Sequence, residues 1–211
     1  MKQLLMTLLL LVDLNMFATS RVDSLIRSAA LQGAIVVCLV ALSSVGGLSS
    51  VEWAFLLVTG LVKAVCLPVV MFKALRSVGI RRELEPMIGY RKSLFVGLFA
   101  VGFSLWISVK LPMPPGVDDP LGLSVALLSM MAGMFLVVSR KKAISQAVGY
   151  LVMENGIYFM GPAMAVHHPL VVEAGVLLDL FVGVFVMGVI ILHIRREFNH
   201  IDVDRLSELK D

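Results

Sequence analysis

Long apolar runs make up most of this chain, and short polar segments rich in turn-forming residues separate them. Runs of about 20 apolar residues are long enough to cross the hydrocarbon core of a membrane as helices. The breaks carry Gly and Pro, as at Gly46-Gly47, Pro112 to Gly116 and Pro169. The pattern predicts an all-α, polytopic membrane helix bundle of about seven transmembrane helices. The predicted helices are residues 3–19, 26–44, 50–75, 93–110, 119–139, 143–166 and 169–194.

Composition supports a membrane protein. The hydrophobic fraction of 59% and the mean hydropathy of +0.94 exclude an ordinary soluble domain. Seven spans with short loops would use all 211 residues. We therefore expect one integral membrane domain, without a separate soluble catalytic domain.

The distribution of cationic residues predicts the orientation. All but three of the 18 Lys and Arg residues fall on one side of the predicted bundle, the exceptions being Lys2, Lys110 and the intramembrane Lys63. The positive-inside rule then puts the N-terminus outside and the C-terminus in the cytoplasm. A cleaved signal peptide is an alternative for the first segment, but Asp13 within its apolar run fits that pattern poorly.

Ionisable residues inside the predicted spans are the main candidates for function. At 1.5 Å per helical residue, Lys63 and Glu154 lie about 20 and 18 Å from the cytoplasmic surface, and Asp179 lies about 15 Å from the outer surface. All three fall in one central slab of the membrane. Glu173 lies shallower, about 6 Å in from Pro169. An ionisable group at this depth costs about 3 kcal/mol on insertion scales. From depth alone, the expected partners of Lys63 are Glu154 and Asp179.

Two interpretations of these residues remain open. Burial disfavours charged forms and brings proton exchange towards neutral pH, which a proton relay requires. Alternatively, Glu154 and Lys63 belong to buried ion pairs that only fix helix packing. Asp13 and Glu52 lie nearer the span ends, where we expect them to reach headgroups or water.

Other residue types predict no further chemistry. Cys38 and Cys66 lie in separate spans without metal-ligand spacing, and we expect them to be small buried packing residues. No Gly-rich phosphate loop, nucleophile triad or metal cluster occurs in the sequence, so we predict no cofactor and no nucleic-acid partner. Histidines are expected in a loop and near the membrane boundary: His167, His168, His193 and His200.

A degenerate internal repeat is a further open possibility. Ser20-Arg21 follows the first helix as Ser139-Arg140 follows the fifth, and Gln32-Gly33 corresponds to Asn155-Gly156. The fourth helix would then join two three-helix units of the same orientation, although chance similarity explains so short a match equally well. The predicted parts are an N-terminal four-helix segment, 1–110, and a three-helix segment with a short cytoplasmic tail, 111–211.

The C-terminal motifs carry a family resemblance. The sequence Gly149-Tyr150-Leu151-Val152-Met153-Glu154-Asn155 is followed by Val172-Glu173-Ala174-Gly175 and then by Arg195-Arg196. From Leu121 to Asp211 the chain resembles the K subunit of bacterial respiratory complex I, a three-helix membrane protein. With the segment from Gly60 to Pro68, the chain is similar to hydrogenase-4 component E of formate hydrogenlyase and related membrane-bound nickel–iron hydrogenases.

This resemblance implies roles for two of the candidate residues. Glu154 and Glu173 match two intramembrane glutamates of the K subunit, which form part of a hydrophilic axis for proton translocation. Lys63 and Asp179 have no counterpart there, so their role as relay residues rests on burial alone. His167-His168 also departs from the more neutral loop of that family.

The expected function is that of a non-catalytic subunit in a bacterial or archaeal cytoplasmic membrane, relaying protons through Glu154, Glu173, Lys63 and Asp179. The expected partners are antiporter-like and complex I-like membrane subunits, the lipid bilayer and a peripheral redox arm with nickel–iron or iron–sulfur centres. Two alternatives stay open: a structural assembly subunit that conducts no protons, and a subunit of a cation/proton antiporter complex.

Overall fold

The computed structural model describes residues 1–19, 21–43, 50–78, 88–112, 119–163 and 188. All regular structure in this part of the chain is helical. The helices are α1 (Lys2–Ala18), α2 (Val22–Ser43), α3 (Ser50–Leu61), the π-helix η1 (Val62–Cys66), α4 (Leu67–Val78), α5 (Tyr90–Lys110), α6 (Pro120–Ser139) and α7 (Ala143–Ala163).

The all-α membrane fold is therefore confirmed. Segments α3, η1 and α4 form one continuous helical span, and the first six predicted spans match described helices within a few residues. Within the described residues, four segments are long and apolar enough to cross a membrane. They are Val22–Ser43, Ser50–Arg76, Arg91–Lys110 and Pro120–Ser139. The predicted last span, 169–194, lies outside the described residues apart from Gly188.

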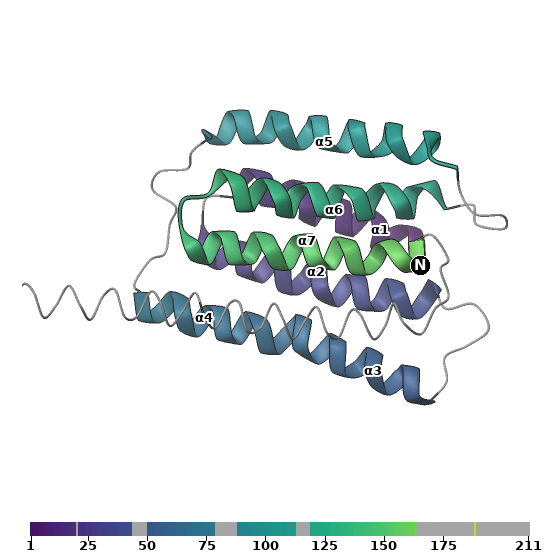
Figure 1. Cartoon of the computed structure of the whole chain (residues 1–211), viewed down its shortest axis with the longest axis horizontal. Helices are drawn as coiled ribbons and strands as arrows, with labels where there is room; N and C mark the ends of the chain where they lie inside the picture. Colours follow the sequence, from purple (N-terminus) through teal and green to yellow (C-terminus); the bar gives the residue numbers. More distant parts are fainter. Residues whose placement is uncertain (20, 44–49, 79–87, 113–118, 164–187, 189–211) are drawn as a thin grey trace, which may run out of the picture.

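Helices α1, α2, α7 and α6 form an inner ring, in which each helix contacts the next and α6 closes back onto α1. Helix α5 packs outside α1 and α6, and the α3–η1–α4 span packs against α2 on the other side. Figure 1 shows the helices lying side by side, with α5 along the upper edge and α3 and α4 along the lower edge. The buried apolar core lies mainly within the inner ring and extends to the inward face of α4.

Polar contacts join α1 to α6 at both ends. At the start of α6, the Asp119 side chain accepts a hydrogen bond from the Gly122 backbone and forms a 2.7 Å salt bridge with Lys2 of α1. At the other end, Arg140 donates to the Thr19 carbonyl oxygen at 3.1 Å. These contacts hold α1 and α6 parallel, so the α1–α2 and α6–α7 hairpins run in the same direction.

Glycines allow α6 and α7 to pack with their backbones in close contact. A Cβ atom on Gly133 would lie 2.2 Å from the backbone nitrogen of Met153, and one on Gly149 would lie 2.8 Å from that of Val137. Small residues at such crossings are typical of membrane helix pairs, where close packing replaces the hydrophobic effect. The close packing fixes the position of α7, which carries Glu154.

The two cysteines correct one expectation. Cys38 and Cys66 are both free thiols and both exposed on the surface of the bundle rather than buried in it. The physical reason is that lipid-facing and core-facing positions of a membrane helix are both apolar, so composition does not distinguish them.

Candidate functional site

A local change in helix type sets the position of Lys63. Within η1, the Leu67 backbone N–H donates to the Val62 carbonyl oxygen, five residues back instead of four. Pro68 follows directly; it lacks an N–H, and its ring would clash with the carbonyl four residues earlier, at Ala64, in a regular α-helix. The wider π turn relieves this conflict, and such turns occur frequently at functional sites.

Gly33 on α2 lets the π turn approach closely. A Cβ atom at Gly33 would lie 3.1 Å from Lys63 Cβ, which is tighter than most side-chain contacts. The absence of that atom brings the Lys63 backbone against α2, and the side chain then extends between α2 and α7. The Gly33 position and the π turn together direct Lys63 into the bundle.

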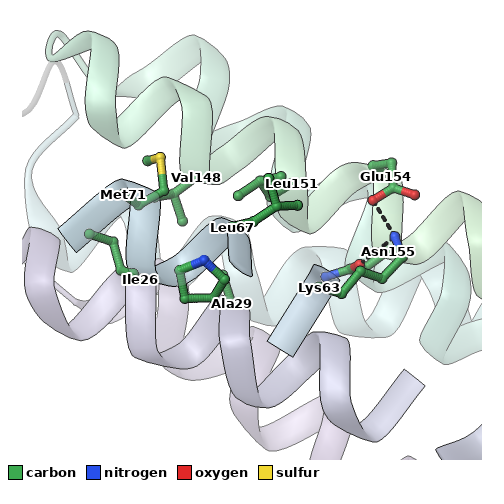
Figure 2. Close-up of a pocket in the computed structure, with 10 residues that line it drawn as sticks. Ile26, Ala29, Lys63, Leu67, Met71, Val148, Leu151, Glu154 and Asn155 are labelled. Atoms are coloured by element: carbon green, nitrogen blue, oxygen red, sulfur yellow. Dashed lines mark hydrogen bonds and ion pairs between the residues drawn. The ribbon is translucent and has the colours of Figure 1, made fainter. Parts of the chain in front are cut away.

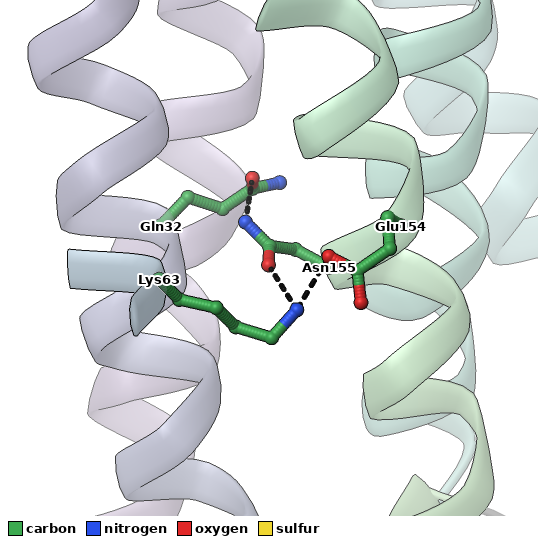
Figure 3. A network of polar contacts seen from close by, with 4 residues as sticks. All are labelled: Gln32, Lys63, Glu154 and Asn155. Carbon is green, nitrogen blue, oxygen red and sulfur yellow. Dashed lines mark hydrogen bonds and ion pairs between the residues drawn. The ribbon is translucent and has the colours of Figure 1, made fainter. Parts of the chain in front are cut away.

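Lys63 forms a buried ion pair with Glu154 of α7. The two residues are only 4% and 1% exposed. The ammonium group also donates to Asn155 Oδ1 at 3.1 Å and lies 5.0 Å from the centre of the Tyr158 ring. Figure 3 shows Lys63 reaching from the short η1 segment to Glu154 and Asn155 on the facing helix.

The polar network continues from this pair across the inner ring. Asn155 Nδ2 donates to Gln32 Oε1 on α2 at 3.0 Å, and Gln32 Nε2 donates to Asp13 Oδ1 on α1 at 2.8 Å. Ser129 of α6 donates its hydroxyl to the other Asp13 oxygen at 2.5 Å. The network therefore links η1 and all four helices of the inner ring, and Asp13, Gln32 and Ser129 are fully buried.

A pocket between α2, the η1–α4 segment and α7 reaches the ion pair. In Figure 2, Lys63, Glu154 and Asn155 lie at one end of this pocket, and Ile26, Met71 and Val148 lie at the other. Its walls are otherwise apolar, formed by Ala29, Leu67, Pro68 and Leu151.

The structure brings together two of the four candidate residues, Lys63 and Glu154, which is one of the two pairings that depth allowed. Glu173 and Asp179 lie outside the described residues. The expectation for Asp13 was wrong: it is fully buried and hydrogen-bonded, not in contact with headgroups or water. Glu52 is partly exposed near the start of α3, as its position near a span end suggested.

Sequence reasoning missed the residues that connect the two carboxylates. Gln32 was noted only as a position of a repeat, Asn155 only in that repeat and in the motif that ends at it, and Ser129 was not noted. An available signal was that Gln32 and Asn155 are amides within apolar spans and that each precedes a glycine. Uncharged amides change the hydropathy profile little, so that profile does not distinguish them from their apolar neighbours.

Among the described residues, no group of three or more His, Cys, Asp or Glu side chains could hold a metal ion. All four histidines lie outside the described residues. The chemistry available in the described site is proton donation and acceptance by one ammonium and two carboxyl groups.

Comparisons with known proteins agree with these features. The family model of NADH-ubiquinone/plastoquinone oxidoreductase chain 4L matches residues 121–211. An uncharacterized protein of Mycobacterium tuberculosis is 32% identical over 155 residues, which cover 71% of this chain and 68% of the relative. Hydrogenase-4 component E of Escherichia coli is 29% identical over 150 residues, covering 70% and 68% of the two chains. No solved structure matches significantly.

Proposed function

The chain is a homologue of hydrogenase-4 component E, and from this similarity and its buried ion pair we propose that it relays protons within a membrane-bound redox complex. The chain is a membrane subunit of a complex I-like assembly. In the proposal it holds no redox centre, and its ionisable side chains form part of a lateral proton path.

The Lys63–Glu154 pair is the observation that carries this proposal. Two opposite charges deep in a membrane protein lose hydration energy that their mutual attraction often fails to recover. An apolar pair of similar volume would therefore hold α7 against η1 at least as well. The presence of an ammonium and a carboxylate at this depth favours a role that needs protonation, because both groups can exchange a proton.

The pocket supports access of protons to this pair. Its far end, near Ile26 and Met71, is directed towards the helix ends that carry Arg21 and Arg140, which the positive-inside rule assigns to the cytoplasm. We infer that protons reach Glu154 from this side along transient water in the pocket. Glu173 and Asp179 are proposed to continue the relay beyond the pair.

The pair also joins the two proposed parts of the chain. Lys63 comes from the N-terminal segment, 1–110, and Glu154 from the K-subunit-like segment, 111–211. We propose that the N-terminal segment supplies a counter-ion that a three-helix relative would obtain elsewhere. Charge changes on one segment would then be transmitted to the other by Coulomb interaction in surroundings of low dielectric constant.

The partners follow from the proposed role. A relay subunit needs a redox-facing neighbour that drives charge changes and an antiporter-like membrane neighbour that receives them. The redox centres, nickel–iron or iron–sulfur, would belong to a peripheral arm on the cytoplasmic side.

The orientation that the positive-inside rule predicts can be tested by reporter fusions. A reporter fused after Arg82 or Asp211 should read cytoplasmic, and one within residues 113–119 should read external.

A structural role is the competing candidate, and the complete hydrogen bonding of Asp13, Gln32 and Asn155 favours it. A network of this kind can specify helix packing without moving protons. A third assignment, to a cation/proton antiporter complex, predicts that the purified chain carries antiporter subunits but no hydrogenase or dehydrogenase subunits.

The Glu154→Gln substitution in the native complex separates relay from structure, since it keeps size and hydrogen bonding but removes the titrating charge. The relay predicts normal assembly on native gels, retained redox activity with artificial acceptors, and loss of redox-driven acidification in inverted membrane vesicles. Ile157→Val, at an exposed position of the same helix, serves as a control for general effects of substitution in α7. Full acidification by an assembled Glu154→Gln complex would refute the relay and leave the structural role.

A further inference from the structure

Asp13 is a second buried carboxylate, which the Lys63–Glu154 relay does not use. It lies on α1, on the other side of α2 from Lys63, and two amide side chains connect the two groups. In order, Lys63 donates to Asn155, Asn155 donates to Gln32, and Gln32 donates to Asp13. Asn155 and Gln32 therefore form a bridge of two amides, hereafter the amide bridge.

The direction of the amide bridge is determined from both ends. The Lys63 ammonium can only donate, so Asn155 must present its oxygen to it and its nitrogen to Gln32. An ionised Asp13 can only accept, so Gln32 must present its nitrogen to Asp13 and its oxygen to Asn155. Both requirements give the same arrangement, with both amide dipoles aligned between a cation and an anion.

Aligned hydrogen bonds polarise one another, and the effect is stronger in surroundings of low dielectric constant. The positive charge of Lys63 therefore acts on Asp13 through the amide bridge as well as through space. Among the described residues, the other side chain hydrogen-bonded to Asp13 is Ser129, whose hydroxyl can rotate to accept a proton from Asp13 or donate one to it.

We propose that Asp13 is a second proton-binding carboxylate of this chain and that it shares Lys63 with Glu154 through the amide bridge. This inference rests on the proposed relay and adds a site on α1 to it. When Glu154 is ionised, it compensates the charge of the Lys63 ammonium, and the protonated form of Asp13 is favoured. When Glu154 is protonated, the charge of Lys63 favours the ionised form of Asp13.

The amide bridge passes on the charge change and carries no protons. Amide groups neither gain nor lose a proton readily near neutral pH, so each carboxyl group exchanges protons on its own side of the bridge. The proton lost by Asp13 passes to the Ser129 hydroxyl as that hydroxyl gives up its own proton to a water molecule, and the proton gained by Glu154 arrives through the pocket. The two sites thus alternate, with one proton bound as the other is released.

The test uses the full-length chain in its membrane complex and infrared difference spectra taken over a pH titration. Protonated carboxyl groups in apolar surroundings give resolved C=O bands. Asp13→Asn should remove one band and Glu154→Gln a different one. In the Glu154→Gln protein, the proton affinity of Asp13 should fall about tenfold, since the full charge of Lys63 then acts on it.

Gln32→Leu breaks the amide bridge and keeps both carboxylates. In this background, the effect of Glu154→Gln on the proton affinity of Asp13 should fall well below tenfold, to the part of the Lys63 charge that acts through space. Gln3→Leu is a matched control, because Gln3 lies on the exposed surface of α1, and the tenfold effect should persist there. Persistence of the tenfold effect in Gln32→Leu would overturn the shared-lysine inference.

The outcomes also distinguish this inference from the relay. If Asp13→Asn removes no band while Glu154→Gln abolishes acidification, Asp13 is not a proton site and the relay stands. If Glu154→Gln leaves acidification intact, the relay itself fails. If the Asp13→Asn protein does not accumulate, Ser129→Ala is measured instead, in protein whose aspartates carry a ¹³C-labelled carboxyl group. One labelled aspartate band must then shift, and an unchanged spectrum would overturn the inference.

Discussion

Helix α5 and the inner ring are built from similarly apolar sequences, but the buried polar side chains of α5 are serines, whereas those of the inner ring include carboxyl and amide groups. Ser108 of α5 is buried and donates to the Leu105 carbonyl oxygen of its own helix at 2.9 Å. Asp13 and Gln32 of the inner ring bond to partners on other helices, far away in the sequence. The outward face of α5 exposes aromatic rings, and Phe99 is 70% exposed.

This difference shows which polar residues of a membrane helix point to a functional site: those whose carboxyl or amide side chains are bonded to other helices. A serine that bonds to the preceding turn satisfies itself and leaves its helix free to pack in any orientation. A side chain whose partner lies on another helix fixes the rotation of both helices, and its loss leaves a buried group unpaired. Helix α5 also bonds across helices, through the Ser104 hydroxyl and that of Ser124 on α6 at 3.2 Å, but this bond joins two neutral hydroxyls. Cross-helix bonds of carboxyl and amide side chains therefore distinguish the inner ring from α5, whereas hydropathy does not.

The largest effect is expected from Lys63→Met in the isolated chain. Removal of the ammonium leaves Glu154 buried without its counter-ion and should lower the free energy of unfolding by about 3–5 kcal/mol. Unfolding in mixed detergent micelles measures this change. Lys110→Met, an exposed position at the end of α5, should change stability by less than about 0.5 kcal/mol.

A double substitution tests whether the Lys63 effect comes from the pair. Lys63→Met with Glu154→Met replaces two charges by apolar groups of similar volume and should recover most of the lost stability. Additive losses would mean that Lys63 is held mainly by interactions other than the Glu154 pair, and would weaken the contrast between the inner ring and α5.

The second prediction compares a glycine of the inner ring that lies against a backbone with a glycine of α5 that has free space around it. Gly133→Ala places a methyl group against the Met153 backbone and should lower the free energy of unfolding by about 3 kcal/mol, because backbone atoms cannot move aside as a side chain can. A Cβ atom on Gly102 of α5 would meet nothing within 4 Å. Gly102→Ala should therefore raise stability by about 0.5–1 kcal/mol, through its higher helix propensity. Equal thermal stability of the two variants would contradict the close packing of α6 and α7.

The sequence predicted the helices well because hydropathy depends on composition over about 20 residues. It also predicted that Lys63 could meet Glu154, because depth along a helix follows from residue count. It did not predict which way each helix faces. The exposure of Cys38 and Cys66 and the burial of Asp13 depend on rotation about the helix axis, which tertiary packing sets.

The sequence did not predict the amide bridge, for a related reason. Asn155 lies next to Glu154, and only the rotation of α7 places its amide between Lys63 and Gln32. The π turn at Lys63 depends on the position of Pro68 together with packing against Gly33, so local sequence alone does not place it. Residue counts along the helices therefore predict the depth of the site, whereas its hydrogen bonds depend on how the helices pack together.

The third prediction compares two buried serines. Ser129→Ala removes a donor to a buried carboxylate and should lower the free energy of unfolding by about 1.5–3 kcal/mol, the range for hydrogen bonds to charged groups. Ser108→Ala on α5 frees a carbonyl that already accepts within its helix and should change stability by less than about 0.5 kcal/mol. Equal losses would show that bonding within one helix is as important here as bonding between helices.

The smallest effect is expected for the aromatic face of α5. Phe17 of the inner ring is 1% exposed, with its ring centre 5.0 Å from that of Phe135, so Phe17→Leu should lower the free energy of unfolding by about 1 kcal/mol. Phe99→Leu should change it by less than about 0.5 kcal/mol in the isolated chain, since this ring is mostly exposed and stacks on Phe103 of its own helix. The same pair of variants measured in the purified complex sharpens the contrast between the two regions. If Phe99→Leu stays neutral there, the outward face of α5 is exposed to lipid; if its effect rises to that of Phe17→Leu, another subunit covers this face.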